Sequence, residues 1–189
     1  MNTFYIIRHG QTKDNLRHII QGHGDSELTE AGVSSLLERA KKLKEIKFDE
    51  VFCSPLLRAK QSLLIMSPYL LLPATPNYSD DLKEIDFGLY TKQPLSQLKD
   101  KILYHKANPS IPYPKGESGE QLIHRSCQFI DTINQQNNDG TFLIVTHFGV
   151  LESIVTYYAD EKFEDICIHK DDIARLIFYS NNEVALTWV

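Results

Sequence analysis

The chain has 189 residues, a formal charge of −5 at pH 7 and 42% hydrophobic residues. At ~100–200 residues per domain, this length predicts one domain, 1–189, with a core large enough to fold without disulfides. The acidic balance argues against a nucleic-acid-binding surface, which needs clustered basic residues, but it does not exclude a small anionic ligand in a locally positive pocket.

The cysteines and the apolar segments bear on where the protein works. Cys53, Cys127 and Cys167 are widely spaced and odd in number, so neither a disulfide framework nor a structural zinc site is expected. The first residues lack the basic and apolar regions of a signal peptide. The longest apolar stretch, 63–74, is interrupted by prolines and is shorter than the ~20 residues that cross a bilayer. We therefore expect a cytoplasmic protein without membrane contact.

Predicted strands and helices alternate through the first half of the chain. Apolar runs rich in β-forming residues predict strands at 3–8, 50–53 and 75–79. Thr29 is expected to cap a helix over 30–46, whose apolar positions recur at helical spacing. Ser54 is expected to cap the next helix, with Pro55 at its first position and a continuation to at least Met66.

The second half continues this pattern and ends in a predicted β-hairpin, 173–179 with 183–189. An irregular helix is expected at 94–106, and Ser118 with Gln121 forms a capping box that opens the next helix. A strand at 141–146 follows, and then another helix. Strands that alternate with helices predict an α/β sheet covered on both faces. The least regular segment, 91–115, is expected to be an insertion or lid over the site.

Two of the predicted strands end in histidine. His9 follows the first strand, and His147 follows the strand that ends at Thr146. Ligands of α/β sheets bind beyond the carboxyl ends of strands, so both side chains are expected at one site. Arg8 adjoins His9, and Arg58 lies at the start of a helix after another strand end. Guanidinium groups suit phosphate oxygens. An arginine at a helix start is usually a solvated surface charge, and Arg58 becomes a candidate only because its helix follows the carboxyl end of a strand.

Six ordered segments carry a more specific signal. They are R-H-G-Q-T-K-D-N from Arg8 to Asn15, Q-G at Gln21 with L-T-E-A-G around Thr29, S-P-L-L-R-A-K-Q-S from Ser54, the acidic stretch at Glu84, G-E-S from Gly116, and T-H at Thr146. Together they resemble the histidine phosphatase superfamily, in its phosphoglycerate-mutase-like branch, in the family's order. The resemblance implies a three-layer α/β/α sandwich whose six-stranded sheet is mostly parallel, with one antiparallel strand.

The resemblance also implies a role for each matched residue. His9 is implied to be the nucleophile that forms a phosphohistidine. Arg8, Arg58 and His147 would surround the phosphoryl oxygens. Glu84 would protonate the leaving oxygen and then deprotonate the attacking water. The remaining implied substrate contacts are Gly10, Thr12, Asn15, Gln21, Gly22 and Phe148. No metal ion or other cofactor is implied, because side chains supply the positive charge.

Two departures from the family pattern bear on function. Phe148 stands where the family often has glycine, and its ring is expected to narrow the pocket. Thr12 and Asp14 stand where the mutase form has serine and tryptophan, which favours a phosphatase. The sequence thus predicts a metal-independent phosphomonoesterase that acts on a small phosphorylated metabolite. The alternatives are a phosphoglycerate-type mutase and a non-catalytic module that binds a phosphorylated ligand. The terminal strand, if exposed, could pair with a second copy in a homodimer.

Two weaker candidates lie outside these segments. His23, beside Gln21 and Gly22, is a candidate to line the pocket, although a surface position is the simpler interpretation. A basic cluster in the predicted insertion comprises Lys99, Lys101, His105 and Lys106. A solvated helix face explains it most simply, and the alternative is a contact with a distal anionic group of the substrate.

Overall fold

The computed structural model describes residues 1–159 and 173–189. Within these residues, six strands form one sheet in the order β3-β2-β4-β1-β5-β6. They are β1 (Asn2–Arg8), β2 (Glu50–Cys53), β3 (Asn77–Tyr78), β4 (Thr141–Thr146), β5 (Ile173–Phe178) and β6 (Val184–Trp188). Neighbours among β1 to β4 pair in parallel, whereas β5 pairs antiparallel with both β1 and β6. One strand, β5, therefore runs against the other five, as predicted.

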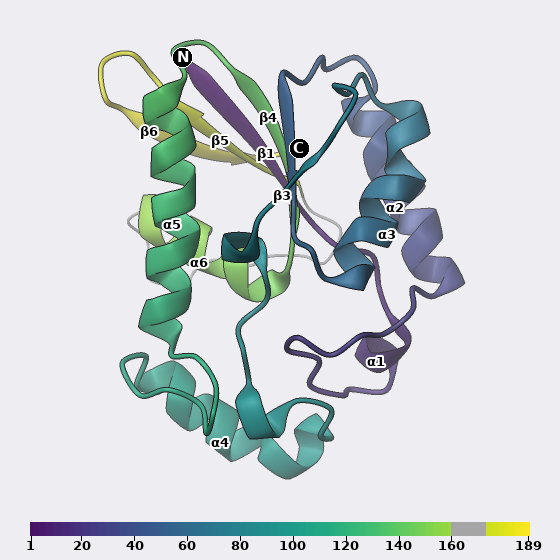
Figure 1. Ribbon diagram of the computed structural model, residues 1–189, viewed down its shortest axis with the longest axis vertical. Coiled ribbons are helices and arrows are strands. Elements are labelled where there is room, and N and C mark those ends of the chain that lie inside the picture. The colour runs from purple at the N-terminus through teal and green to yellow at the C-terminus, as the bar shows by residue number, and fades with distance from the viewer. Residues whose placement is uncertain (160–172) are drawn as a thin grey trace.

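Helices cover both faces of the sheet (Figure 1). The helices α2 (Glu30–Leu43) and α3 (Leu57–Met66) lie on one face, and α5 (Gly119–Gln136) and α6 (Phe148–Ala159) lie on the other. Side chains that alternate along β1 enter two separate cores. Phe4 and Ile6 pack with residues of α5 and α6, whereas Tyr5 and Ile7 pack with residues of α2 and α3. This alternation follows from the two-residue period of a strand and confirms the predicted three layers.

The remaining elements are short or lie beyond the strand ends. Three single turns of 3-10 helix are η1 (Ser67–Tyr69), η2 (Asp80–Leu82) and η3 (Gly88–Tyr90). The helices α1 (Lys13–Leu16) and α4 (Leu95–Ala107) lie at the end of the molecule toward which β1, β2 and β4 run (Figure 1). The helix predicted at 94–106 is confirmed within one residue at each end, and only its expected irregularity was wrong, because α4 is a continuous α-helix of 13 residues.

The predicted helix caps fare differently. Thr29 accepts the Gly32 N–H at 3.0 Å, and Ser118 forms its capping box with Gln121, as expected. The first of these helices ends at Leu43, three residues before the predicted end. The prediction that Ser54 caps the helix, with Pro55 at its first position, was wrong, because α3 begins only at Leu57 and has no side-chain cap.

The expectations about disulfides and membrane spans can be compared with the described residues only. Cys53 and Cys127 are buried free thiols, and Cys167 lies outside these residues. In the part of the chain that the structure describes, no helix is long and apolar enough to cross a membrane.

Candidate active site

The parallel pairing of β1 and β4 sets the positions of the two histidines. Arg8 lies opposite Thr146 in the sheet, so His9 and His147 leave neighbouring strand ends together. The backbone N–H of His9 donates to the Thr146 carbonyl at 2.8 Å, which extends the pairing one residue further. The two rings are buried, with centres 5.2 Å apart. The structure thus brings together the histidines that the strand ends predicted.

Two hydrogen bonds define the tautomer of His9. Arg58 Nε lies 3.2 Å from His9 Nε2, and an arginine N–H can only donate. His9 Nε2 therefore accepts and carries no proton. The proton sits on Nδ1, which donates to the Gly10 carbonyl at 2.7 Å. The ring is held as a neutral imidazole with the lone pair of Nε2 on the side of Arg58.

Burial and nearby cations keep both histidines neutral. Burial is the largest cause that lowers the pKa of His9 well below 6.5, and the positive charges of Arg58 and Arg8 lower it further. The pKa of His147 is lowered in the same way, first by burial and then by the Arg58 charge. At neutral pH, both rings are therefore uncharged, and the positive charge beside them comes from the arginines.

These histidines make the fold sensitive to acid. Their pKa values are lower in the folded chain than the ordinary 6.5, so below that pH the unfolded chain binds more protons. Each group has no effect well above pH 6.5, and below it the free energy of unfolding should fall by up to about 1.4 kcal/mol per pH unit for each histidine. Urea unfolding from about pH 8 to about pH 5 measures this slope.

Protonation of carboxyl groups also destabilises proteins in acid. A matched pair of variants is therefore needed to assign part of the slope to His9. His9→Asn should flatten the slope below pH 6.5, whereas His124→Asn, at an exposed position on α5, should keep it. Equal slopes in both variants would contradict a contribution from His9.

Arg58 ties the histidine to the loop around Gly22. Its Nη2 donates to the Gly22 carbonyl at 2.8 Å and its Nη1 to the Gly24 carbonyl at 3.1 Å. Gly22 has a φ of +49°, and a Cβ there would lie 2.7 Å from Thr91 Oγ1. Only glycine fits this turn without strain. The loop and the guanidinium therefore hold each other in place.

A cavity of about 300 Å³ opens beside His9. Its walls are Arg8, His9, Asn15, Ile19, Gln21, Gly22, Arg58, Glu84, Phe87 and Phe148. The sequence predicted all of these residues except Ile19 and Phe87. Ile19 lies outside the matched segments, and Phe87 lies inside the acidic one, 84–88, where the resemblance gave it no role.

Three predicted residues lie outside these walls. Gly10 donates its N–H to Ser62 Oγ, and a Cβ on it would lie 2.9 Å from the Gly32 carbonyl oxygen. Gly10 thus lets helix α2 approach the strand end. Thr12 is buried and caps α1, with its hydroxyl 3.0 Å from side-chain oxygens of both Asn15 and Gln21. It therefore positions two wall residues from behind.

His147 is the third residue outside the walls. Its Nε2 lies 2.7 Å from Ser54 Oγ, and this hydroxyl also accepts the Leu56 N–H at 3.3 Å, before α3 begins. No hydrogen-bond partner for its buried Nδ1 occurs among the described residues. His147 stands behind the cavity, against the ring of His9.

Glu84 lines the same cavity as His9, and its side chain lies against the first turn of α6. Its Oε1 accepts the backbone N–H groups of Ile85 and Gly149, each at 3.0 Å. A Cβ on Gly149 would lie only 2.4 Å from this oxygen, so the glycine makes room for the carboxyl group. Since both bonds go to Oε1, Oε2 is the oxygen that can carry a proton.

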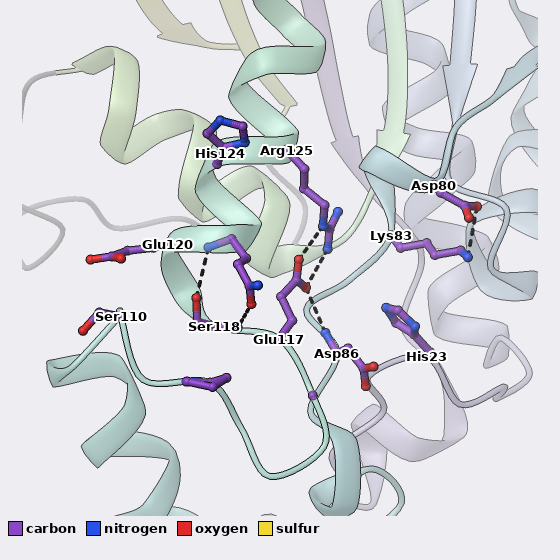
Figure 2. Close-up of a pocket in the computed structure, with 13 residues that line it drawn as sticks. His23, Asp80, Lys83, Asp86, Ser110, Glu117, Ser118, Glu120, His124 and Arg125 are labelled. Carbon is purple, nitrogen blue, oxygen red and sulfur yellow. Dashed lines mark hydrogen bonds and ion pairs between the residues drawn. The ribbon is translucent and has the colours of Figure 1, made fainter.

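The loop that carries Glu84 is held by Glu117 and Arg125 (Figure 2). Arg125 forms two bonds to the Glu117 carboxylate, at 2.6 and 3.0 Å. It also donates to the carbonyls of Asp81 at 2.6 Å and Glu84 at 3.1 Å. Glu117 accepts the N–H of Asp86 at 3.1 Å. The sequence analysis assigned Arg125 no role, although its place two turns along α5 from the G-E-S segment was a usable signal.

The two weaker candidates are also placed. His23 does not line the cavity beside His9, and its Nε2 lies 2.8 Å from the Glu84 carbonyl oxygen. In the basic cluster, His105 is buried and Lys106 pairs with Glu152 at 2.8 Å. A uniformly solvated helix face is therefore wrong for these two residues.

Comparison with known proteins identifies the family. The profile of the Histidine phosphatase superfamily (branch 1) matches residues 4–189. The chain belongs to this superfamily. It is 31% identical over 156 residues to the uncharacterized phosphatase PhoE of Bacillus subtilis, a match that covers 82% of this chain and 77% of that protein.

Two further matches fit this result. The metal-independent phosphoserine phosphatase of Arabidopsis thaliana is 31% identical over 156 residues, which cover 79% of this chain and 65% of that protein. The solved phosphoglycerate mutase of Bacillus anthracis has the same fold, with a TM-score of 0.85, 22% identity, and coverage of 99% of this chain and 92% of that one. This histidine phosphatase is a phosphoric monoester hydrolase, as the sequence segments predicted.

Proposed function

We propose that this histidine phosphatase hydrolyses a small phosphorylated metabolite without a metal ion, through a phosphohistidine on His9. The observation that carries the proposal is the unprotonated Nε2 of His9, which shares one cavity with two arginines and a carboxyl group. A phosphate ester repels nucleophiles by its negative charge. A neutral imidazole between guanidinium groups is suited to attack it.

In the first step, the phosphoryl oxygens take the N–H groups of Arg8 and Arg58. The Arg58 Nε–H that now occupies His9 Nε2 turns to an oxygen, which frees the lone pair for attack. The Nε2–P bond forms as the bond between phosphorus and the alcohol oxygen breaks. Glu84 gives its proton to that oxygen, and the alcohol leaves. The Gly10 carbonyl stabilises the positive charge that develops on the ring.

In the second step, a water molecule attacks phosphorus. Glu84, now a carboxylate, takes one proton from the water as the P–Nε2 bond breaks. The products are inorganic phosphate and the neutral imidazole of His9, with Glu84 protonated again. The buried ring of His147, packed against His9, keeps the nucleophile in place through both steps.

The experiment that tests this proposal is hydrolysis of p-nitrophenyl phosphate after treatment with EDTA and dialysis. Because Arg8 and Arg58 supply the positive charge, the enzyme should keep nearly all of its activity. Activity that disappears with EDTA and returns with added Mg²⁺ or Zn²⁺ would contradict the proposal.

The same assay addresses the two alternatives. A phosphoglycerate-type mutase would move phosphate between hydroxyls of phosphoglycerate and depend on a bisphosphorylated primer. A non-catalytic module would bind phosphate esters without turnover. Steady release of inorganic phosphate, with no primer, supports the phosphatase over both.

Pairing of two copies through the edge strand β6 stays a prediction, as does cytoplasmic localisation.

A further inference from the structure

A second cavity, of about 330 Å³, adjoins the one beside His9. Glu84, Phe87 and Phe148 line both cavities. The other walls come from the end of α4, the link to α5, and the facing sides of α5 and α6. Glu84, the proposed acid, therefore stands where the two cavities meet.

We infer that this second cavity binds the alcohol part of the substrate and selects a bulky, uncharged, apolar alcohol. The inference rests on the function proposed above. The segment 91–115 supplies Lys106, Pro109 and Tyr113 to the walls. On this inference it is an insertion that shapes specificity.

The position of Glu84 leads to the first half of this inference. An acid that protonates the leaving oxygen must touch that oxygen. The phosphoryl group lies between His9 and the arginines. The alcohol part of the substrate therefore extends past the Glu84 carboxyl group, on the side away from His9. The second cavity is the space that shares Glu84 with the first. An alcohol bound there places its oxygen against the proton donor.

The composition of the walls leads to the second half. Phe87, Tyr113 and Phe148 present aromatic rings, and Leu122 and Ile123 add aliphatic surface from α5. The rings of Phe87 and Tyr113 pack edge to face, with centres 4.9 Å apart, so this wall is preformed. Apolar surface of this kind favours a ligand that loses little hydration on entry.

The charges in the walls disfavour a second anionic group on the substrate. Lys106 Nζ lies 2.8 Å from Glu152 Oε1 and 5.9 Å from the centre of the Phe148 ring. Its charge is thus already matched by a carboxylate. An additional carboxylate or phosphate would lose its hydration and find Lys106 engaged. The alternative role for the basic cluster, contact with a distal anionic group, is therefore disfavoured at Lys106.

The test compares three monoesters of primary alcohols, so that the reacting oxygen is similar in each. They are 3-phenylpropyl phosphate, glycerol 1-phosphate and 3-phosphoglycerate. For the wild-type enzyme, kcat/KM should be roughly tenfold or more higher for the phenylpropyl ester than for the glycerol ester. It should be lowest for 3-phosphoglycerate, because of its carboxylate.

A matched pair of variants locates the preference. Thr156→Trp places a ring in the second cavity and should lower the phenylpropyl-to-glycerol ratio of kcat/KM by about fivefold or more. Thr132→Trp makes the same change at an exposed position on α5, outside both cavities, and should leave the ratio unchanged. Glu152→Gln removes the carboxylate charge that pairs with Lys106 and should raise kcat/KM for 3-phosphoglycerate relative to the glycerol ester.

The outcomes separate the inference from the proposed function. A wild-type enzyme that hydrolyses all three esters without preferring the phenylpropyl ester overturns the inference and leaves the phosphatase intact. So does an equal change of the ratio in both tryptophan variants. A wild-type enzyme that hydrolyses none of the esters, nor p-nitrophenyl phosphate, overturns the proposed function itself.

Discussion

His9→Ala is expected to lower kcat for p-nitrophenyl phosphate by about ten-thousand-fold or more, because among the described residues no other histidine lines this cavity to accept the phosphoryl group. The other histidine at the site, His147, is buried behind the cavity and is not among its walls. Steady-state assays measure the loss, and a radiolabelled phosphate on the wild-type protein that is missing from the variant identifies the attachment site.

The control for this variant is His124→Ala, which removes an exposed histidine of α5 and should keep full activity. Circular dichroism and the urea midpoint of His9→Ala show whether the variant is folded. A folded His9→Ala protein with more than about one per cent of wild-type turnover would rule out His9 as the nucleophile.

Glu84→Gln is expected to produce a loss that depends on the leaving group. The glutamine oxygen can still accept the N–H groups of Ile85 and Gly149, but the side chain cannot transfer a proton. For an alkyl ester such as 3-phenylpropyl phosphate, whose alcohol must be protonated as it leaves, kcat should fall by about thousandfold. For 2,4-dinitrophenyl phosphate, the phenolate leaves without a proton, so the first step should remain fast.

The second step also needs Glu84, to deprotonate water. With the dinitrophenyl ester, the variant should therefore release about one equivalent of phenolate rapidly and then turn over slowly. Stopped-flow absorbance measures this burst. Glu120→Gln, an exposed carboxylate on α5, is the control and should behave as wild type. Equal losses on both esters, with no burst, would show that Glu84 is not the acid.

Much of the fold and of the cavity beside His9 could be predicted because the information is local in the chain. The strands that end in His9 and His147 are short apolar runs, and parallel strands place their carboxyl ends at one edge. The Thr29 and Ser118 caps depend on groups within three residues. Such features need no knowledge of the rest of the fold.

The parts that could not be predicted depend on distant partners. Ser54 has the residue type and spacing of a helix cap, yet its hydroxyl bonds to His147, 93 residues away in the chain. Gly10 was matched to the substrate, but its close neighbour is Gly32 of α2. Arg125 reaches the Glu84 loop only after α5 docks. In each case tertiary contacts decide between roles that the local sequence leaves open.

The second cavity shows the same limit on a larger scale. Phe87, Tyr113, Leu122 and Phe148 come from four separate segments, and each is an ordinary apolar residue in its own context. No periodicity or motif connects them. Of these four, the sequence marked Phe148, because it departs from the family pattern, and Tyr113 only as part of 91–115, the segment expected to be an insertion.

The bond between His9 Nδ1 and the Gly10 carbonyl has a consequence for the chemical form of the enzyme. Because Nδ1 holds the proton and Nε2 has the lone pair, phosphate can attach to only one ring nitrogen. The phosphohistidine proposed above is therefore expected to be the 3-isomer, with no admixture of the 1-isomer. Its P–N bond survives alkali and is cleaved in acid. An acidic peptide preparation would miss the modification entirely, whereas an antibody specific for the 3-isomer would detect it.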